Sequence, residues 1–275
     1  MPEGDTVFQT ATRLRGALAG RVLTRTDFRV PRYATVDLSG RAVVGVVSRG
    51  KHLLIRVDGD TTLHTHLRMD GAWRIRPASA QRGPRWGVGG RDQVRVVLEN
   101  DTYAAVGLRL PVVDLLRTSD EARVVGHLGP DLLGPDWDAD EAARRLAAQP
   151  ARTIGEALLD QRNLAGVGNV YRAELCFLNG VSPFARVDAA GDLRTMADLA
   201  HRALAANRER IGHVTTGDPR PGRQNWVYGR AGRPCRRCRT PIRSAEAGEP
   251  KRWVFWCPTC QPGPDQQREG REAPR

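Results

Sequence analysis

The chain has 275 residues, a net charge of +12 and an isoelectric point near 10.6. This length supports two domains with a sizeable core, and no apolar run approaches the ~20 residues of a membrane span. The first residues carry Glu3 and Asp5 instead of the apolar core of a signal peptide, so the composition argues against export. Most of the excess positive charge follows His201, and this basic C-terminal quarter predicts a polyanionic partner such as nucleic acid.

The first residues, Met-Pro-Glu-Gly-Asp, are a candidate reaction centre. Removal of the initiator methionine leaves Pro2 with a free secondary amine, whose pKa of roughly 8 lies well below the ~10.4 of a lysine. Such an amine is partly neutral near pH 7, and its attack on a sugar aldehyde carbon forms a Schiff base. Glu3 lies beside it, in a position to move protons. The alternative is an ordinary N-terminus in which Glu3 caps the first helix.

The first half of the chain predicts a β-sandwich behind an N-terminal helix. Helical spacing over residues 5–19 places Val7, Ala11, Leu14 and Leu18 on one face. Short Val-rich runs separated by Gly, Asp and Pro then predict strands. These strands are Val22–Val30, Ala42–Val47, Leu53–Val57, Thr62–His66, Val94–Leu98 and Tyr103–Val106. The Gly- and Pro-rich stretch 77–92 is predicted to be a loop.

Lysine is rare in this chain. Of the 43 Lys and Arg residues, only Lys51 and Lys251 are lysines. Arginine stays protonated, whereas lysine can release its proton and act in acid–base chemistry. Lys51 is therefore a candidate catalytic residue, and its alternative is a surface residue of a strand.

The second half of the chain is predicted to be mainly helical after a connector at 126–138. The expected helices run from Asp138 or Asp140 to Ala148, over Ala151–Gln161, over Asn169–Leu178 and over Leu193–Ile211, with a turn at 163–168. Cys176 in the third of these is expected to be buried and inert. The polar segment 215–234 leads into a further module, and 262–275 is predicted to be a disordered tail.

Four of the five cysteines form a metal-binding pattern. Cys235 and Cys238, and Cys257 and Cys260, form two Cys-x2-Cys pairs separated by eighteen residues. Each pair can direct both thiolates to one tetrahedral ion, so the spacing predicts a structural Zn²⁺ site. The intervening segment is predicted to be a β-hairpin with its turn near Ala247-Gly248, which would direct Lys251 and Arg252 at DNA. Two redox-active pairs are the alternative.

Four motifs in this order resemble the bacterial formamidopyrimidine-DNA glycosylase/endonuclease VIII family. They are MPEGDT, SRGKHLL, DQRNLAGVGNVYRAELCF and PCRRC…FWCPTCQ, and the resemblance covers nearly the whole chain except the tail. It implies an α+β multidomain fold: a β-sandwich with flanking helices, a helix–two-turn–helix domain and a four-cysteine zinc-finger hairpin. The expected boundaries are 1–125 for the catalytic sandwich, 126–138 for the linker, 139–228 for the helical domain, 229–263 for the zinc finger and 264–275 for the tail.

The resemblance implies a role for five residues. Pro2 would attack C1′ of the damaged nucleotide, and Glu3 would protonate the sugar ring oxygen. Lys51 would donate a proton during β-elimination and contact a phosphate. Asn169 would bind phosphate beside the backbone amides of a helix start, where it could also act as the helix cap. Arg252 would grip the flanking phosphate and take part in δ-elimination.

A base must leave the duplex before it can be attacked, and side chains fill the space that it leaves. By resemblance, the segment 66–71 supplies this wedge, with Met69 as its apolar tip and Arg68 beside it; Met69 in core packing is the alternative. Arg68 and His127 are also predicted to contact DNA, although they stand where endonuclease VIII carries an amide side chain and an arginine. Arg239 replaces the usual glycine after the second Cys and must adopt a tight turn. Glu174 is expected to be structural.

The resemblance favours a bifunctional DNA glycosylase and AP lyase of base excision repair that removes oxidised pyrimidines by β,δ-elimination. The short segment before Cys235 and its sequence WVYGRAGRPC are closer to endonuclease VIII than to the purine-specific branch. An oxidised-purine glycosylase and a non-catalytic zinc-ribbon DNA-binding protein are the alternatives. We further expect damaged DNA as partner, no membrane, no small-molecule cofactor, a monomer, and a location in the bacterial cytoplasm at the nucleoid.

Overall fold

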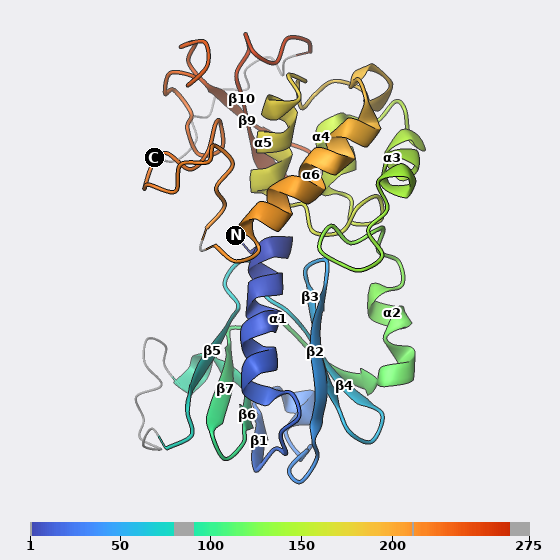
Figure 1. Cartoon of the computed structure of the whole chain (residues 1–275), viewed down its shortest axis with the longest axis vertical. Coiled ribbons are helices and arrows are strands. Elements are labelled where there is room, and N and C mark those ends of the chain that lie inside the picture. Colours follow the sequence, from blue (N-terminus) through green and yellow to red (C-terminus); the bar gives the residue numbers. More distant parts are fainter. Residues whose placement is uncertain (1, 80–90, 211, 265–275) are drawn as a thin grey trace. The chain divides into compact units, whose positions relative to one another are not determined.

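The computed structural model describes residues 2–79, 91–210 and 212–264 (Figure 1). The chain divides into two compact units, of which the first ends at His127 and the second begins at Leu128. Within the described residues, no helix combines the length and the apolar character that a membrane crossing requires.

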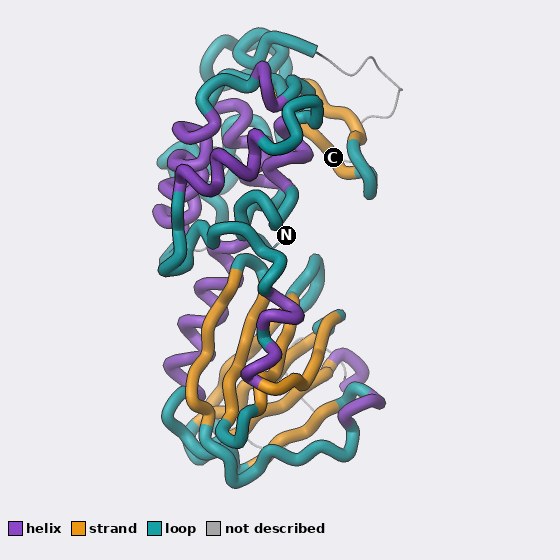
Figure 2. The backbone as a smooth tube through the Cα atoms, turned by 90° about the vertical axis from the view of Figure 1, so that its right-hand side faces the viewer, coloured by secondary structure: helices purple, strands orange, loops and turns teal. Residues whose placement is uncertain are grey.

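Two four-stranded antiparallel sheets form the first unit, and Figure 2 shows their strands in orange. One sheet has the order β1 (Arg25–Phe28), β6 (Val94–Glu99), β7 (Tyr103–Leu108) and β5 (Ala72–Pro77). The other has the order β2 (Val43–Arg49), β3 (His52–Val57), β4 (Thr61–His66) and β8 (Val112–Arg117). Helix α1 (Gly4–Leu18) packs chiefly against β2 and buries the predicted apolar face, which confirms the sandwich behind an N-terminal helix.

The strand predictions missed one edge strand of each sheet. β5 and β8 lie at the edges, where alternate side chains face solvent and charged residues interrupt the apolar pattern. The predicted strand Val22–Val30 is too long, because only Arg25–Phe28 pairs with β6. Short helical segments were also missed: α2 (Ala122–Val125), η1 (Pro31–Tyr33), η2 (Arg91–Gln93) and η3 (Thr118–Asp120). Of the predicted loop 77–92, residues 80–90 lie outside the described residues.

Helices dominate the second unit. They are α3 (Ala139–Ala147), α4 (Ile154–Leu159), α5 (Asn169–Leu178) and α6 (Leu193–Asn207), with η4 (Val187–Ala189) between the last two. Asp138 caps α3 by accepting hydrogen bonds from two backbone amides. Of the two predicted starts, Asp138 and Asp140, the first is therefore correct. The predicted helix Ala151–Gln161 is too long, because Thr153 caps α4 and the helix ends before Asp160. Helix α6 ends four residues before Ile211, which lies outside the described residues.

The predicted β-hairpin follows the helices. β9 (Arg243–Ala247) pairs with β10 (Arg252–Trp256) in antiparallel register, and the turn lies between Ala247 and Arg252. The hairpin packs against α5 through a small apolar core that includes Phe177, Ile242 and Phe255. Of the predicted tail, only residues up to 264 are described.

Candidate active site

A buried carboxylate lies at the start of α1. Pro2 is half-buried, while Glu3 has 0% exposure and occupies the N-cap position of the helix. Its side chain makes no capping hydrogen bond, so the capping alternative holds for its backbone only. Because a buried carboxylate is costly unless its surroundings compensate, such a group beside Pro2 is a candidate for proton transfer. The positive end of the helix dipole lies at the same place and favours a negative charge.

Lys51 lies at the tip of the hairpin that joins β2 to β3. Arg49 pairs with His52, so Gly50 and Lys51 form a two-residue loop. Gly50 has φ 54°, the left-handed conformation that the first loop residue of a type II′ turn requires. The glycine in SRGKHLL therefore makes the tight turn that presents Lys51 at the sheet end.

The predicted wedge is a short loop between β4 and β5. The Gly71 amide donates to the Leu67 carbonyl oxygen at 2.8 Å, which closes the loop. A Cβ at Gly71 would lie 2.5 Å from that oxygen, so only glycine is accommodated there. Arg68 has φ 50°, and Met69 is 59% exposed at the top of the loop. Core packing, the alternative for Met69, is therefore excluded.

Three further histidines lie near these residues, and of them only His66, the first residue of the predicted wedge segment, was predicted as part of a site. His52 stacks on His64 with ring centroids 5.1 Å apart, and it meets His66 edge-on at 5.0 Å. The exposed His127, which was predicted to contact DNA, lies edge-on to His52 at 6.3 Å. The sequence signal for this grouping was the presence of His52 in HLL and of His64 and His66 in THTH on two successive strands. When these strands pair, His52 lies directly opposite His66.

In the second unit, Asn169 and Arg172 connect α5 to the hairpin. Both side chains are buried, and both donate to the carbonyl oxygen of Trp253, at 3.0 Å and 2.9 Å. Arg172 also donates to Oδ1 of Asn169. Gly168 is the N-cap of α5, and Asn169 is the first helical residue. Asn169 is therefore not the helix cap, because its amide is bound to the hairpin instead.

Arg252 lies at the first position of β10, one residue before the carbonyl that these side chains hold. It lines a hollow of about 170 Å³ between α4, α5 and the hairpin turn, together with Arg152, Glu156 and Asp160. Asp160 already pairs with Arg152 and Arg162, each at 2.8 Å, and the hydrogen bond from Arg162 lowers its pKa. No carboxylate of the described residues forms an ion pair with Arg252, so its guanidinium can take an anion.

Glu174 is structural, as predicted. This fully buried carboxylate accepts backbone hydrogen bonds at 2.8 to 2.9 Å from Trp226, Val227 and Tyr228, and a further one from the hydroxyl of Thr215. Burial raises its pKa, and the four hydrogen bonds act in the opposite direction. The carboxylate thereby fixes the polar segment that precedes the cysteines.

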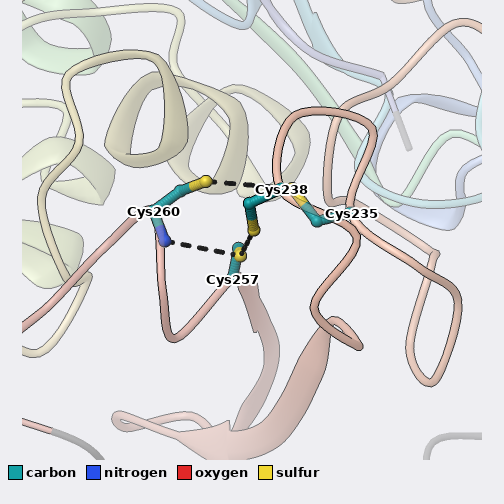
Figure 3. Close-up of side chains that lie close together, drawn as sticks. All are labelled: Cys235, Cys238, Cys257 and Cys260. Carbon is teal, nitrogen blue, oxygen red and sulfur yellow. Dashed lines mark hydrogen bonds between the residues drawn. The ribbon is translucent and has the colours of Figure 1, made fainter.

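The four cysteines form one cluster (Figure 3). Their sulfur atoms all lie within 4.8 Å of one another, with Cys235 Sγ 3.9 Å from Cys260 Sγ and Cys238 Sγ 3.4 Å from Cys257 Sγ. Arg239 has φ 69°, which confirms the tight turn predicted for it. Cys176 is buried elsewhere, and its burial raises the thiol pKa to about 12, so it is inert as expected. The cluster can hold a metal ion.

The structure divides the predicted site residues between the units. The first unit holds Pro2, Glu3, Lys51, Arg68, Met69 and His127. The second holds Asn169, Arg252 and the four cysteines. The first group combines the buried carboxylate of Glu3 with a lysine and exposed side chains, and the second combines arginine, amide and thiol groups.

Known proteins match both units. Sequence models of the formamidopyrimidine-DNA glycosylase N-terminal domain and H2TH domain match residues 1–111 and 128–207. The chain is 57% identical to "Probable endonuclease 8 2" of Streptomyces coelicolor, with 100% of this chain and 99% of the relative covered. It is 52% identical to "DNA-(apurinic or apyrimidinic site) lyase Nei2" of Mycolicibacterium smegmatis, with 95% and 99% covered. The fold resembles Lactococcus lactis Fpg in complex with abasic-site DNA, with TM-score 0.78, 22% identity and 95% and 100% coverage.

Proposed function

Because this chain belongs to the formamidopyrimidine-DNA glycosylase family, we propose that it is a bifunctional DNA glycosylase and AP lyase of base excision repair. Its proposed substrates are oxidised pyrimidines in DNA. The observation that carries this proposal is the full-length similarity to two proteins named for endonuclease 8 and AP lyase activity. The buried Glu3 beside Pro2 supports it, since a DNA-binding protein without catalysis has no need of a buried carboxylate at its N-terminus.

In the proposed reaction, the amine of Pro2 attacks C1′, and the bond to the damaged base breaks. Glu3 protonates the sugar ring oxygen, which opens the ring and leaves an iminium between Pro2 and C1′. The iminium acidifies C2′, so loss of a proton there expels the 3′ phosphate. Lys51, at the tip of its hairpin, exchanges protons during this elimination and contacts a phosphate. A second elimination expels the 5′ phosphate, and water releases the sugar remnant from Pro2.

The second unit would hold the DNA backbone. Arg252 grips the phosphate beside the lesion and assists the second elimination, and Asn169 lies beside the first-turn amides of α5, which favour a phosphate. In the first unit, Met69 fills the space of the extruded base, with Arg68 and His127 near the DNA.

The cysteine cluster is proposed to bind one structural Zn²⁺. Zn–S bonds of about 2.3 Å in a tetrahedron place the sulfur atoms about 3.8 Å apart. The distances of 3.4 and 3.9 Å between the cysteine sulfur atoms are close to this value. Four thiolates close the coordination shell, so the ion would stabilise the hairpin and supply no step of the reaction.

The remaining assignments follow from the same proposal. The partner is damaged DNA, the protein acts as a monomer without a small-molecule cofactor, and it works in the bacterial cytoplasm at the nucleoid. The domains are the sandwich at 1–125, a linker at 126–138, the helical domain at 139–228, the zinc finger at 229–263 and the tail at 264–275.

Borohydride trapping tests the chemistry. Wild-type protein incubated with a thymine-glycol duplex and borohydride should form a covalent adduct, since the reductant converts the iminium into a stable amine. Pro2→Gly should form much less, because its N-terminal amine is primary, lacks the ring that fixes its position, and forms an imine that becomes a cation only on protonation. Arg144→Ala, which removes an exposed arginine of α3 that pairs with Glu141, serves as the control and should trap normally.

Three results would contradict parts of the proposal. An equal adduct in Pro2→Gly would assign the reaction to another amine, and Lys51 would be the first to test. An adduct with 8-oxoguanine DNA but not with thymine-glycol DNA would replace pyrimidines by purines as the substrate. DNA binding without any adduct would support a non-catalytic zinc-ribbon protein.

A further inference from the structure

Four of the six histidines of this chain lie together in the first unit. His52, His64, His66 and His127 form this imidazole cluster. His52 opposes His66 in the register of β3 and β4, and His64 shares the face of His66 because it lies two residues away. The ring of His52 contacts the other three, and its Nδ1 lies 2.9 Å from Nε2 of His64. His52 is therefore the centre of the cluster.

The cluster is connected to the wedge loop by a hydrogen bond. The backbone amide of Arg68 donates to Nδ1 of His66 at 2.9 Å. Arg68 has φ 50°, a conformation that residues with a Cβ adopt at a cost, so this bond holds a backbone that would otherwise relax. Met69, the exposed tip, follows directly. Because Nδ1 accepts this bond, it carries no proton, and a doubly protonated His66 would lose it.

The surroundings of His66 keep its ring uncharged. Burial is the largest effect, and the positive charges of Arg68 and Lys51 and the neighbouring His64 add to it. Together they lower the pKa of His66 to about 4. A proton on this ring would therefore place a third positive charge beside Arg68 and Lys51.

The same effects keep two further rings of the cluster, His52 and His64, uncharged. Burial lowers the pKa of His52 to about 3, and the further groups that lower it are His66, His64, His127 and Arg68. Burial also lowers the pKa of His64, although Asp114 on β8 opposes this shift from 3.8 Å away. Among the described residues, Asp114 is thus a carboxylate whose charge acts on the cluster, and the charges of Arg68 and Lys51 act in the opposite direction.

We propose that the imidazole cluster is a positioning element, in which the hydrogen bond from the Arg68 amide to Nδ1 of His66 holds the Arg68–Met69 loop in its DNA-binding conformation. This inference rests on the proposed function, because the wedge belongs to it. Imidazole suits the task since it packs like an aromatic ring and still offers an unprotonated nitrogen to the Arg68 amide. An apolar ring in the place of His66 would pack but accept nothing.

Two variants of His66 separate this role from packing. His66→Asn keeps an acceptor near the position of Nδ1, and His66→Leu removes it. Each is compared with wild type on a thymine-glycol duplex, which requires the wedge, and on a single-stranded oligonucleotide with an abasic site, which does not. His66→Leu should cut the duplex roughly 3- to 10-fold more slowly, the equivalent of one lost hydrogen bond, with single-strand cleavage unchanged. His66→Asn should recover duplex cleavage to within about 2-fold.

The pH profile is the second readout. In wild type, the ratio of duplex to single-strand cleavage should fall as the pH is lowered from 7 towards the pKa of His66 at about 4, and in His66→Asn it should stay flat. His201→Gln, a variant of a histidine outside the cluster that stacks on Trp137, should behave as wild type.

Equal losses of His66→Leu on both substrates, or no recovery in His66→Asn, would overturn the proposal and indicate a packing or phosphate-binding role. A flat ratio in wild type would overturn it as well. Wild type that cleaves neither substrate would instead contradict the proposed function itself.

Discussion

The two units present opposite kinds of polar chemistry. In the first unit, the predicted reacting groups include the buried carboxylate of Glu3, and His52, His64 and His66 lie together with lowered pKa values. In the second, the predicted contacts are an arginine, an amide and four thiols, and the buried carboxylate of Glu174 is structural. Buried titratable groups respond to pH, whereas guanidinium groups keep their charge. The comparison indicates that the proposed proton transfer and the proposed binding of the DNA backbone depend on different residue types. A given change in sequence, metal or pH should therefore affect one unit more than the other.

Loss of the Glu3 carboxylate should have the largest effect. Glu3→Gln is expected to slow release of the damaged base by about 100- to 10,000-fold, since an amide cannot deliver the proton. Single-turnover cleavage of lesion duplex measures this rate. Asp5→Asn is the matched control, because Asp5 is also buried at the start of α1 but accepts from its neighbour Thr6. If both variants lost the same fraction of the cleavage rate, Glu3 would have a structural role, and the proposed difference in chemistry between the two units would be wrong.

Metal removal should affect the second unit alone. A zinc chelator, or Cys235→Ala, is expected to disorder the hairpin and weaken DNA binding on the order of 10- to 100-fold through lost phosphate contacts. Metal analysis and a binding titration at fixed salt provide the measurement. Cys176→Ala should retain the metal, because this thiol lies outside the cluster. Full binding by metal-free protein would remove the hairpin from the DNA-binding surface.

Mild acid should destabilise the first unit first, while activity at neutral pH stays unchanged. In the folded chain, the pKa values of His52 and His66 fall from 6.5 to about 3 and about 4. Between these values and 6.5 the unfolded chain binds protons that the folded chain does not. The stability that they contribute is therefore complete above pH 6.5 and declines as the pH falls towards 4, by about 1.4 kcal/mol per pH unit for each imidazole.

Calorimetry at several pH values between 7 and 4 would measure this decline. His52→Phe keeps a stacking ring without a titrating nitrogen. The free energy of unfolding of this variant should therefore fall less steeply with decreasing pH than that of wild type, because one imidazole fewer contributes. In the second unit, Asp160 has a lowered pKa, so its contribution is lost only below the ordinary aspartate range. A decline that is the same in wild type and His52→Phe would contradict the assignment to the cluster.

Features encoded over a few neighbouring residues were predictable from the sequence. The two Cys-x2-Cys pairs predicted the metal cluster, and the glycine-free knuckle predicted the left-handed Arg239. Features that depend on strand register or on packing between elements were not. The imidazole cluster requires β3 and β4 to pair with His52 opposite His66, and no local pattern indicates that pairing. The position of Asn169 at a helix start suggested a helix cap. Its actual partner, the Trp253 carbonyl, lies 84 residues further along the chain, so no local pattern could indicate it.

That shared carbonyl also determines how the hairpin can move. The amide of Asn169 and the guanidinium of Arg172 occupy the oxygen of Trp253 from two sides, and both groups are planar and buried. A strand held at this point cannot slide or twist relative to α5 without breaking both bonds together. The start of α5 and Arg252, the neighbour of Trp253, are therefore held at a fixed distance from each other before any ligand binds.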